Sequence, residues 1–361
     1  MDRIKEVFNS NMVNFRKKLS GYKDKILEKL HLSKEQRREL VERLKMLKRK
    51  TIDKVLPTGD SIDEINILSK IAGALFQGDM VLSKSEPLLT RLATLGFFHT
   101  HSRYDRDQFI TVDEQNIKPD WLDQFTRETI STNNNYGLTY DYGSLMHYRA
   151  TSASGNKKPT MVPKDVMFTE TLGSPFISYY DLLMINTHYN CTDACKGKNT
   201  PCQNNGFAHP RDCSKCICPS GYGGQYCEKR PPGCGAELEA TKEWKPLVDD
   251  LGDRNAGLTP REDFMKCNYW IKAPAGKKIE VKFVDFPDGI AVDGCTYAGV
   301  EIKTHSDQRR TGYRHKINYD YELFCSKEDA NTVLKSLSSL VPVITYNRIY
   351  ATVTKLEYRY V

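Results

Sequence analysis

Apolar residues recur at helical spacing in the first 76 residues of the chain. Ser33 with Gln36 forms a capping-box pair, and Ser61 with Glu64 forms a second one. An apolar stripe follows each pair, made by Leu40, Val41, Leu44 and Leu47 in the first run and by Ile65, Leu68, Ala72 and Leu75 in the second. The second stripe ends at Gly78, because glycine breaks a helix. The pattern predicts helices whose stripes pack as core.

The rest of the chain shows two other patterns. Residues 94–177 have few periodic runs, which predicts mostly irregular structure, whereas "SYYDLLMINTHYN" at 178–190 has the spacing of one amphipathic helix capped by Ser178 and Asp181. Near the C-terminus, apolar positions alternate at Ile279, Val281 and Phe283, and again at Tyr350, Thr352, Thr354 and Leu356. Alternation predicts strands with one buried face, so the last domain is expected to be all-β.

The net charge of +7 comes from one segment of the chain. Residues 1–57 hold 17 Lys and Arg against 8 Asp and Glu, which leaves 36 against 38 for the other residues. The basic segment has neither interleaved aromatic residues nor a nucleic-acid reading motif, so a solvated helix face explains it better than nucleic-acid binding.

Cysteines are confined to the second half of the chain. All eleven follow residue 190, and seven crowd into 191–227, where the segment from Cys195 to Cys227 ends in the turn-rich "CPSGYGGQYC". A segment this short and this dense in cysteine predicts a disulfide scaffold formed in an oxidising compartment, hence a secreted protein. The sequon Asn190-Cys191-Thr192 adds a candidate glycosylation site at Asn190.

Export raises a question about the N-terminus. Residues 1–18 have no apolar run of the length a signal peptide needs, so we expect that the natural start lies upstream or that the sequence is incomplete. No stretch of the chain approaches the about 20 apolar residues of a membrane span, so a transmembrane anchor is not expected.

One stretch carries part of a zinc-protease motif. In H-E-x-x-H-x-x-G-x-x-H, two His one helical turn apart and a third after a Gly bind zinc, while the Glu handles protons. Gly96 and His99 occupy the last two landmarks. Counting back, the first His position holds Leu89, the Glu position Thr90 and the second His position Ala93. None of these three side chains is a normal zinc ligand.

Four segments resemble the astacin family of metzincins, and in particular its secreted nematode-type members. They are "GFFHTHSRYDRD" at 96–107, "YDYGSLMHY" at 140–148, "FQGDM" at 76–80 and "SYYDLLMINTHYNC" at 178–191. The resemblance implies a zinc cofactor, one per intact subunit, with His99 as its third ligand. It also implies that Met146 lies beneath the metal in a Met-turn and that Tyr148 approaches zinc and stabilises the oxyanion. Asp79 would occupy zinc's open position in the zymogen.

The cysteine-rich end is similar to an EGF-like module followed by a CUB domain, which is a β-sandwich. The first resemblance implies the pairs Cys195–Cys213, Cys202–Cys216 and Cys218–Cys227, and the second implies Cys234–Cys267 and Cys295–Cys325. Cys191 is then left unpaired, because its partner in astacins lies in the N-terminal half of the catalytic domain and this chain has no earlier cysteine.

The expected architecture is a multidomain α+β protein. It consists of a helical propeptide (1–80), a junction (81–93), the C-terminal part of a metzincin catalytic domain (94–191), an EGF-like module (192–230) and a CUB-like sandwich (234–358). The N-terminal half of the catalytic domain, with two His ligands and the Glu, is expected to be missing, through exon skipping or an incomplete gene model.

Two functions remain open. The first is a secreted zinc metalloendopeptidase, made as a zymogen, that hydrolyses peptide bonds through a zinc-activated water; this chain is then expected to be inactive and to bind zinc weakly at most. The alternative is a non-catalytic secreted protein whose EGF-like and CUB-like modules bind matrix or protein partners.

The missing half also has physical consequences. Phe97, Phe98, Leu145 and Met146 are expected to be partly without packing partners, whereas the CUB-like module should fold independently. Thr100 stands where many astacins carry a Glu that meets the mature N-terminus, which weakens the expectation of that contact here. The segment near Tyr297 lacks the acidic residue of a calcium site.

Overall fold

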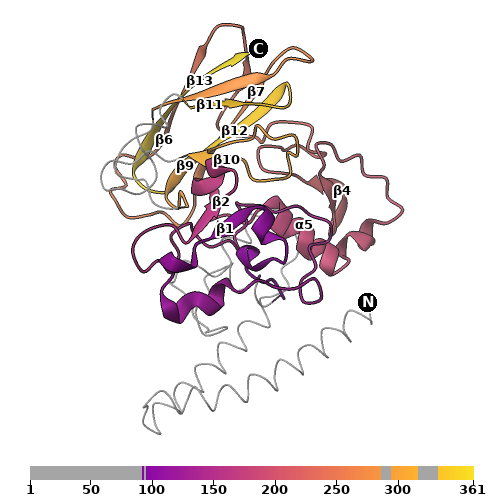
Figure 1. Ribbon diagram of the computed structural model, residues 1–361. Coiled ribbons are helices and arrows are strands. Elements are labelled where there is room, and N and C mark those ends of the chain that lie inside the picture. Colours follow the sequence, from indigo (N-terminus) through magenta and orange to yellow (C-terminus); the bar gives the residue numbers. More distant parts are fainter. Residues whose placement is uncertain (1–91, 93–94, 286–293, 316–331) are drawn as a thin grey trace, which may run out of the picture. The chain divides into compact units, whose positions relative to one another are not determined.

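The computed structural model describes Leu92 and residues 95–285, 294–315 and 332–361, all of which belong to one compact unit of the chain, 66–361. The expected helical propeptide, Asp79, the junction positions Leu89, Thr90 and Ala93, and Cys325 lie outside the described residues. Figure 1 shows the described elements and labels some of them with the names used below.

The astacin-like part (95–190) is mostly irregular, as its sequence predicts. Two short antiparallel strands, β1 (Ile110–Val112) and β2 (Met161–Pro163), form its sheet. Five 3-10 helices lie between its ends: η1 (Thr100–Ser102), η2 (Arg106–Gln108), η3 (Glu114–Asn116), η4 (Pro119–Phe125) and η5 (Val166–Thr171). Its core consists of nine buried side chains, from Ile110, Ile117, Phe125, Tyr140, Tyr142, Ala150, Met161, Phe168 and Leu172.

Helix α5 (Tyr179–His188) closes this part, and its predicted cap is confirmed. Ser178 is the N-cap: its side chain accepts a hydrogen bond from the Asp181 backbone N–H, and the Asp181 carboxylate accepts one from the Ser178 N–H. These reciprocal bonds satisfy two N–H groups that would otherwise have no partner at the helix start, so the local sequence fixes where α5 begins.

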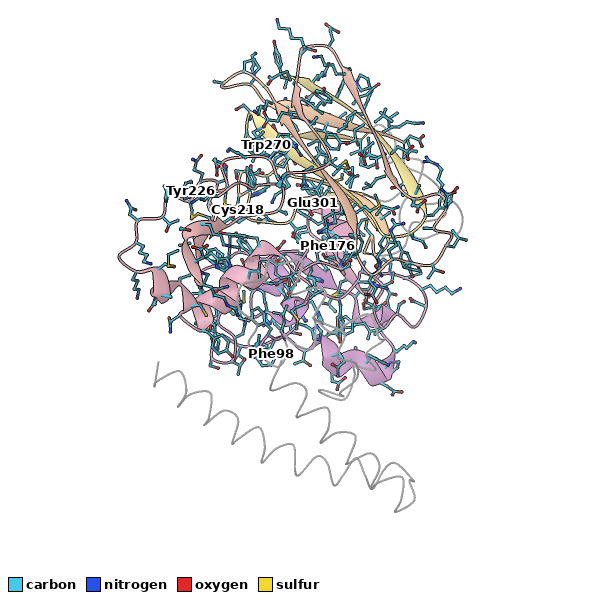
Figure 2. All side chains as sticks on the ribbon, turned by 180° about the vertical axis from the view of Figure 1, so that it is seen from behind. Phe98, Phe176, Cys218, Tyr226, Trp270 and Glu301 are labelled. Atoms are coloured by element: carbon cyan, nitrogen blue, oxygen red, sulfur yellow. A yellow bond between two sulfur atoms is a disulfide. The ribbon has the colours of Figure 1, made fainter. Side chains whose placement is uncertain are left out.

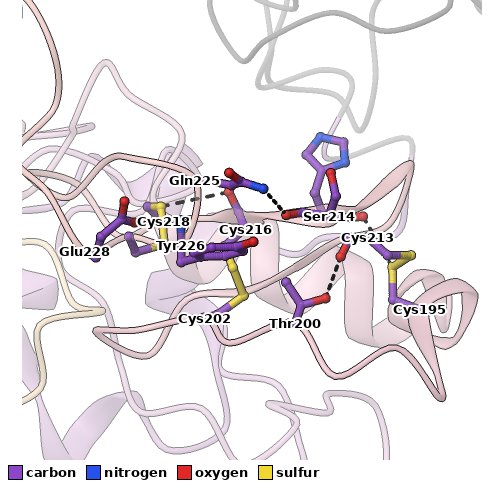
Figure 3. The surroundings of a disulfide bond; sticks show 12 residues. Cys195, Thr200, Cys202, Cys213, Ser214, Cys216, Cys218, Gln225, Tyr226 and Glu228 are labelled. Carbon is purple, nitrogen blue, oxygen red and sulfur yellow. Dashed lines mark hydrogen bonds between the residues drawn. A yellow bond between two sulfur atoms is a disulfide. The ribbon is translucent and has the colours of Figure 1, made fainter.

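The EGF-like module (192–230) is held by disulfides rather than by a large core. Its regular elements are η6 (Cys191–Cys195) and the hairpin of β3 (Phe207–His209) with β4 (Asp212–Ile217). The structure contains the bonds Cys195–Cys213, Cys202–Cys216 and Cys218–Cys227. Figure 3 shows Gln225 donating its side-chain amide to the Ser214 carbonyl, a contact that joins the last loop to β4.

The CUB-like module (234–361) is a sandwich of two sheets. One sheet has the order β10-β9-β12-β7-β5 and the other β11-β8-β13-β6. The strands of the first are β10 (Tyr313–His315), β9 (Ala298–Ile302), β12 (Leu340–Asn347), β7 (Met265–Lys272) and β5 (Glu237–Glu239). Those of the second are β11 (Val333–Lys335), β8 (Ile279–Asp285), β13 (Ala351–Tyr360) and β6 (Lys245–Gly252). Seventeen buried side chains among its described residues form the core of this sandwich.

The predicted alternation is confirmed on β8 and, with one exception, on β13. Ile279, Val281 and Phe283 are buried on β8, and Thr352, Thr354 and Leu356 are buried on β13. The prediction for Tyr350 was wrong, because β13 begins one residue later and Tyr350 is 37% exposed in a left-handed turn conformation (φ 46°). The strand also continues to Tyr360, past the expected limit at residue 358.

Candidate metal site

His99 is held against the Met-turn by its backbone and its ring. Gly96, with φ +93°, turns the chain just before it, a conformation that glycine adopts without a steric penalty. The Thr100 N–H donates to the Met146 carbonyl (2.9 Å), and His99 Nδ1 lies 3.1 Å from the same oxygen. Because a carbonyl only accepts, Nδ1 carries the proton and Nε2 keeps the lone pair that a metal would use.

Met146 and Tyr148 lie beside this histidine. The Tyr148 ring centroid is 4.4 Å from that of His99, and Met146 is 1% exposed. The expectation that Met146 is partly without packing partners was therefore wrong, whereas Phe98 is 44% exposed. Met146 is buried because hydrogen bonds hold the turn that carries it against α5.

The hydrogen bonds between this turn and α5 form a chain that ends on Asp181. The Thr100 hydroxyl donates to the Ser144 hydroxyl (2.9 Å), which donates to Asp181 Oδ1 (2.6 Å), while the Leu145 N–H donates to Asp181 Oδ2 (3.0 Å). Burial raises the pKa of Asp181 to about 6, against the opposing effect of these donors. Thr100, which the sequence alone showed only as a departure from the family pattern, is therefore the first donor in this hydrogen-bond network.

Two further imidazoles contact Tyr148, His101 through its ring and His147 by donating from Nδ1 to the Tyr148 carbonyl (2.6 Å), and the sequence reasoning missed both. His101 is fully buried with its ring centroid 4.2 Å from that of Tyr148; Nε2 donates to the Gln124 carbonyl, and Nδ1 has no hydrogen-bond partner. Burial lowers the pKa of His101 well below its usual value and that of His147 to about 4, so both are neutral at pH 7. His147 Nε2 accepts from the Tyr140 hydroxyl.

The "RYDRD" segment is a scaffold for this region. Arg103 makes a bidentate pair with Asp105 (2.9 and 2.8 Å) and donates to the carbonyls of residues 138 and 139. Arg106 donates to the carbonyls of His101 and Phe125. Two guanidinium groups therefore satisfy backbone carbonyls at four positions of this mostly irregular part.

The residues present do not fit a catalytic zinc centre. Such a centre takes three protein ligands and keeps one position open. His99 offers one nitrogen, and the sequence places Leu89, Thr90 and Ala93 where the other groups belong. In the part of the chain that the structure describes, the one group of three closely spaced His, Cys, Asp or Glu ligand atoms is Cys234, Asp249 and Cys267, and its two cysteines are joined in a disulfide.

Comparison with known proteins relates one segment of the chain to a family. Residues 91–190 match the family described as Astacin (Peptidase family M12A). This segment is therefore similar to the astacin family. The chain is 49% identical over 267 residues to zinc metalloproteinase nas-31 of Caenorhabditis elegans, an alignment that covers 73% of the chain and 42% of the relative. It is 37% identical over 277 residues to nas-25 of the same organism, covering 74% and 65%. It therefore spans less than two thirds of either relative.

Two solved structures are each similar to part of the chain. One is high choriolytic enzyme 1, a hatching enzyme zinc-protease from Oryzias latipes, with 28% identity and a TM-score of 0.28 over 30% of this chain and 52% of that chain. Another is the MASP-1 CUB2 domain bound to Ca²⁺, with 16% identity and a TM-score of 0.20 over 34% of this chain and 96% of that chain.

The remaining site residues lie at the ends of modules. Asn190 is exposed in a left-handed conformation, and Cys191 beside it is a half-buried free thiol whose pKa is raised by burial. Cys234 is bonded to Cys267, whereas the partner expected for the buried Cys295 lies outside the described residues. No helix among the described residues has the length and apolar character needed to span a membrane.

Proposed function

We propose that the gene encodes a secreted zinc metalloendopeptidase made as a zymogen, and that this chain itself has no peptidase activity. The relatives named as zinc metalloproteinases support the first half of the proposal. The disulfides support an extracellular location, and Asp79 in "FQGDM" is the candidate zymogen switch.

The observation that supports the absence of peptidase activity is that His99 is the one zinc ligand of the motif that this sequence contains. Its Nε2 is oriented by the Met146 carbonyl, and Tyr148 lies against it, yet the sequence supplies neither of the other two histidines nor the glutamate. A single imidazole binds zinc weakly, and hydrolysis also needs a group that takes a proton from the attacking water. The chain thus has one oriented histidine of a metal site and lacks the other two histidines and the glutamate.

The test is a paired measurement of metal and activity. The chain, produced under oxidising conditions with its mass confirmed, is equilibrated with Zn²⁺, dialysed, and assayed for bound zinc and for cleavage of an unfolded polypeptide; a His99→Ala variant is the matched control. We expect zinc far below one ion per chain and no cleavage in either protein. Zinc near one per chain, with chelator-sensitive cleavage that His99→Ala abolishes, would refute the proposal.

A second candidate function is a non-catalytic secreted binding protein. Four disulfides and a sandwich core among the described residues of the EGF-like and CUB-like modules support this candidate, because such modules could bind a partner without catalysis. The discriminating measurement is tandem mass spectrometry of the native protein. Peptides spanning residues 81–99 as printed support the binding protein, whereas peptides that join residue 94 to a longer catalytic segment support the enzyme.

A further inference from the structure

We propose that one edge of the CUB-like module, residues 301–314, is a docking surface for the astacin-like part of the same chain, and that this contact completes the core of the truncated catalytic domain. The docking surface consists of β9's last residues, β10's first residues and the loop between them. Its occupant is residues 141–176 of the astacin-like part.

The two cores exchange apolar side chains. Tyr313 of β10 packs against the astacin-like core, with its ring centroid 4.3 Å from that of Phe168. In return, Met167 of η5 packs against the sandwich core. Phe176, labelled in Figure 2, lies 4.9 Å from Tyr346 of β12, ring to ring. Side chains shared between two cores bury apolar area that separation would return to water.

Buried polar groups are matched across the same contact. The Asp141 carboxylate accepts from the Thr311 backbone N–H (3.1 Å) and hydroxyl (3.2 Å), and Asp141 is 3% exposed. Arg314 donates its backbone N–H to the Thr171 hydroxyl (3.1 Å) and its guanidinium to Ser174 Oγ (2.6 Å). Leaving buried donors and acceptors unpaired is costly, so these pairs specify one arrangement of the two surfaces.

Close backbone approach makes the fit selective. A Cβ added to Gly143 would lie 2.3–2.4 Å from the Thr311 side chain, and one added to Gly294 would lie 2.5 Å from the Gly173 carbonyl oxygen. Gly143 does not have a positive φ, so alanine there is strained only by the contact with Thr311. The position is therefore a specific probe of docking.

The astacin-like part depends on this contact for its stability, whereas the sandwich does not. Among the described residues, the sandwich core holds seventeen buried side chains between two sheets, whereas the core of the astacin-like part holds nine beside a two-stranded sheet. A small core with a two-stranded sheet is marginal by itself. The CUB-like module thus stabilises the astacin-like part, and a partner from outside the chain must bind the CUB-like module elsewhere than at the docking surface.

The test separates the two parts covalently without unfolding them. A protease site is inserted between Asp193 and Ala194, which are exposed; no disulfide among the described residues crosses this point, and the only cysteine before it is Cys191. After cleavage of the folded chain, non-reducing electrophoresis verifies that the fragments are not covalently joined, and size-exclusion chromatography measures whether they stay together.

We expect the cleaved wild-type fragments to co-elute and those of Gly143→Ala to separate. Gly155→Ala is the matched control, because its new Cβ would lie 3.5 Å from the nearest atom, an ordinary contact. Tyr313→Ala tests the surface from the CUB-like side, with a dissociation constant raised on the order of 100-fold or more. Hydrogen exchange on β7 and β12 verifies that the sandwich stays folded in each variant. Separation of the wild-type fragments at micromolar concentration, or co-elution of both docking variants as tightly as Gly155→Ala, would overturn the proposal.

Discussion

Replacing Arg314 with methionine should destabilise the protein by leaving a buried carboxylate without its main partner. Arg314 donates two hydrogen bonds to Glu301 Oε2 (3.2 and 3.0 Å), and the two side chains are 3% and 5% exposed. Burial alone would raise the pKa of Glu301, yet Arg314 and Lys303 together hold it below its usual value. Glu301 is therefore ionised at pH 7 and depends on these cations.

The expected loss is about 3 kcal/mol in the free energy of unfolding. Removing one partner of a buried ion pair typically costs about 3–5 kcal/mol, because an uncompensated charge remains. The lower end applies here, since Lys303 is also buried nearby and the Gly312 N–H still donates to Glu301 Oε1 (3.0 Å). The double variant Glu301→Gln with Arg314→Met removes both charges, so it should be more stable than the sum of the two single losses by about 2 kcal/mol.

Urea unfolding at pH 7, followed by far-UV circular dichroism and by tryptophan fluorescence, measures the four proteins of this cycle. The measurement is repeated at pH 5. Once Arg314 is gone, burial raises the pKa of Glu301, so the variant takes up a proton more readily and its loss of stability should shrink as pH falls. A loss below 1 kcal/mol for Arg314→Met, strict additivity in the double variant, or a loss that grows toward pH 5 would refute the reasoning.

Three further substitutions test separate contacts. Burial raises the pKa of Asp181 from 3.8 to about 6, so its contribution to stability is full below pH 3.8 and is lost as pH rises through 6. Relative to Asp181→Asn, the free energy of unfolding of the wild type should fall by about 3 kcal/mol over that window. A difference in urea unfolding that does not change with pH would contradict this. Ser178→Ala removes the N-cap of α5 and should cost about 1 kcal/mol, read as faster amide exchange in α5, whereas Ser178→Thr should retain protection. Trp270→Phe loses the 2.7 Å hydrogen bond to the Gly221 carbonyl and should cost about 1–2 kcal/mol in thermal unfolding; an unchanged midpoint would show that this bond does not stabilise the fold.

Much of the local structure could be predicted from the sequence. The capping box places the start of α5 at Ser178, and the two-residue alternation places Ile279, Val281 and Phe283 on the buried face of β8. Both are decided by contacts within a few residues or by side-chain direction along one strand, which a linear pattern encodes. The incomplete metal site is also fixed by the sequence, because ligand chemistry depends on residue identity, and Leu89, Thr90 and Ala93 are not zinc ligands wherever they lie.

Only the tertiary structure decided how the distant segments meet. The burial of Met146 depends on a carboxylate from Asp181, 35 residues along the chain, and the docking of Asp141 depends on Thr311, which is 170 residues away. Such contacts depend on complementary shape and matched donors between surfaces that have no common local pattern, so periodicity and motif spacing do not encode them. For this chain, the sequence alone predicted the modules and placed Leu89, Thr90 and Ala93 where zinc ligands and the Glu would stand, whereas the fold determined that the astacin-like part packs against the CUB-like module.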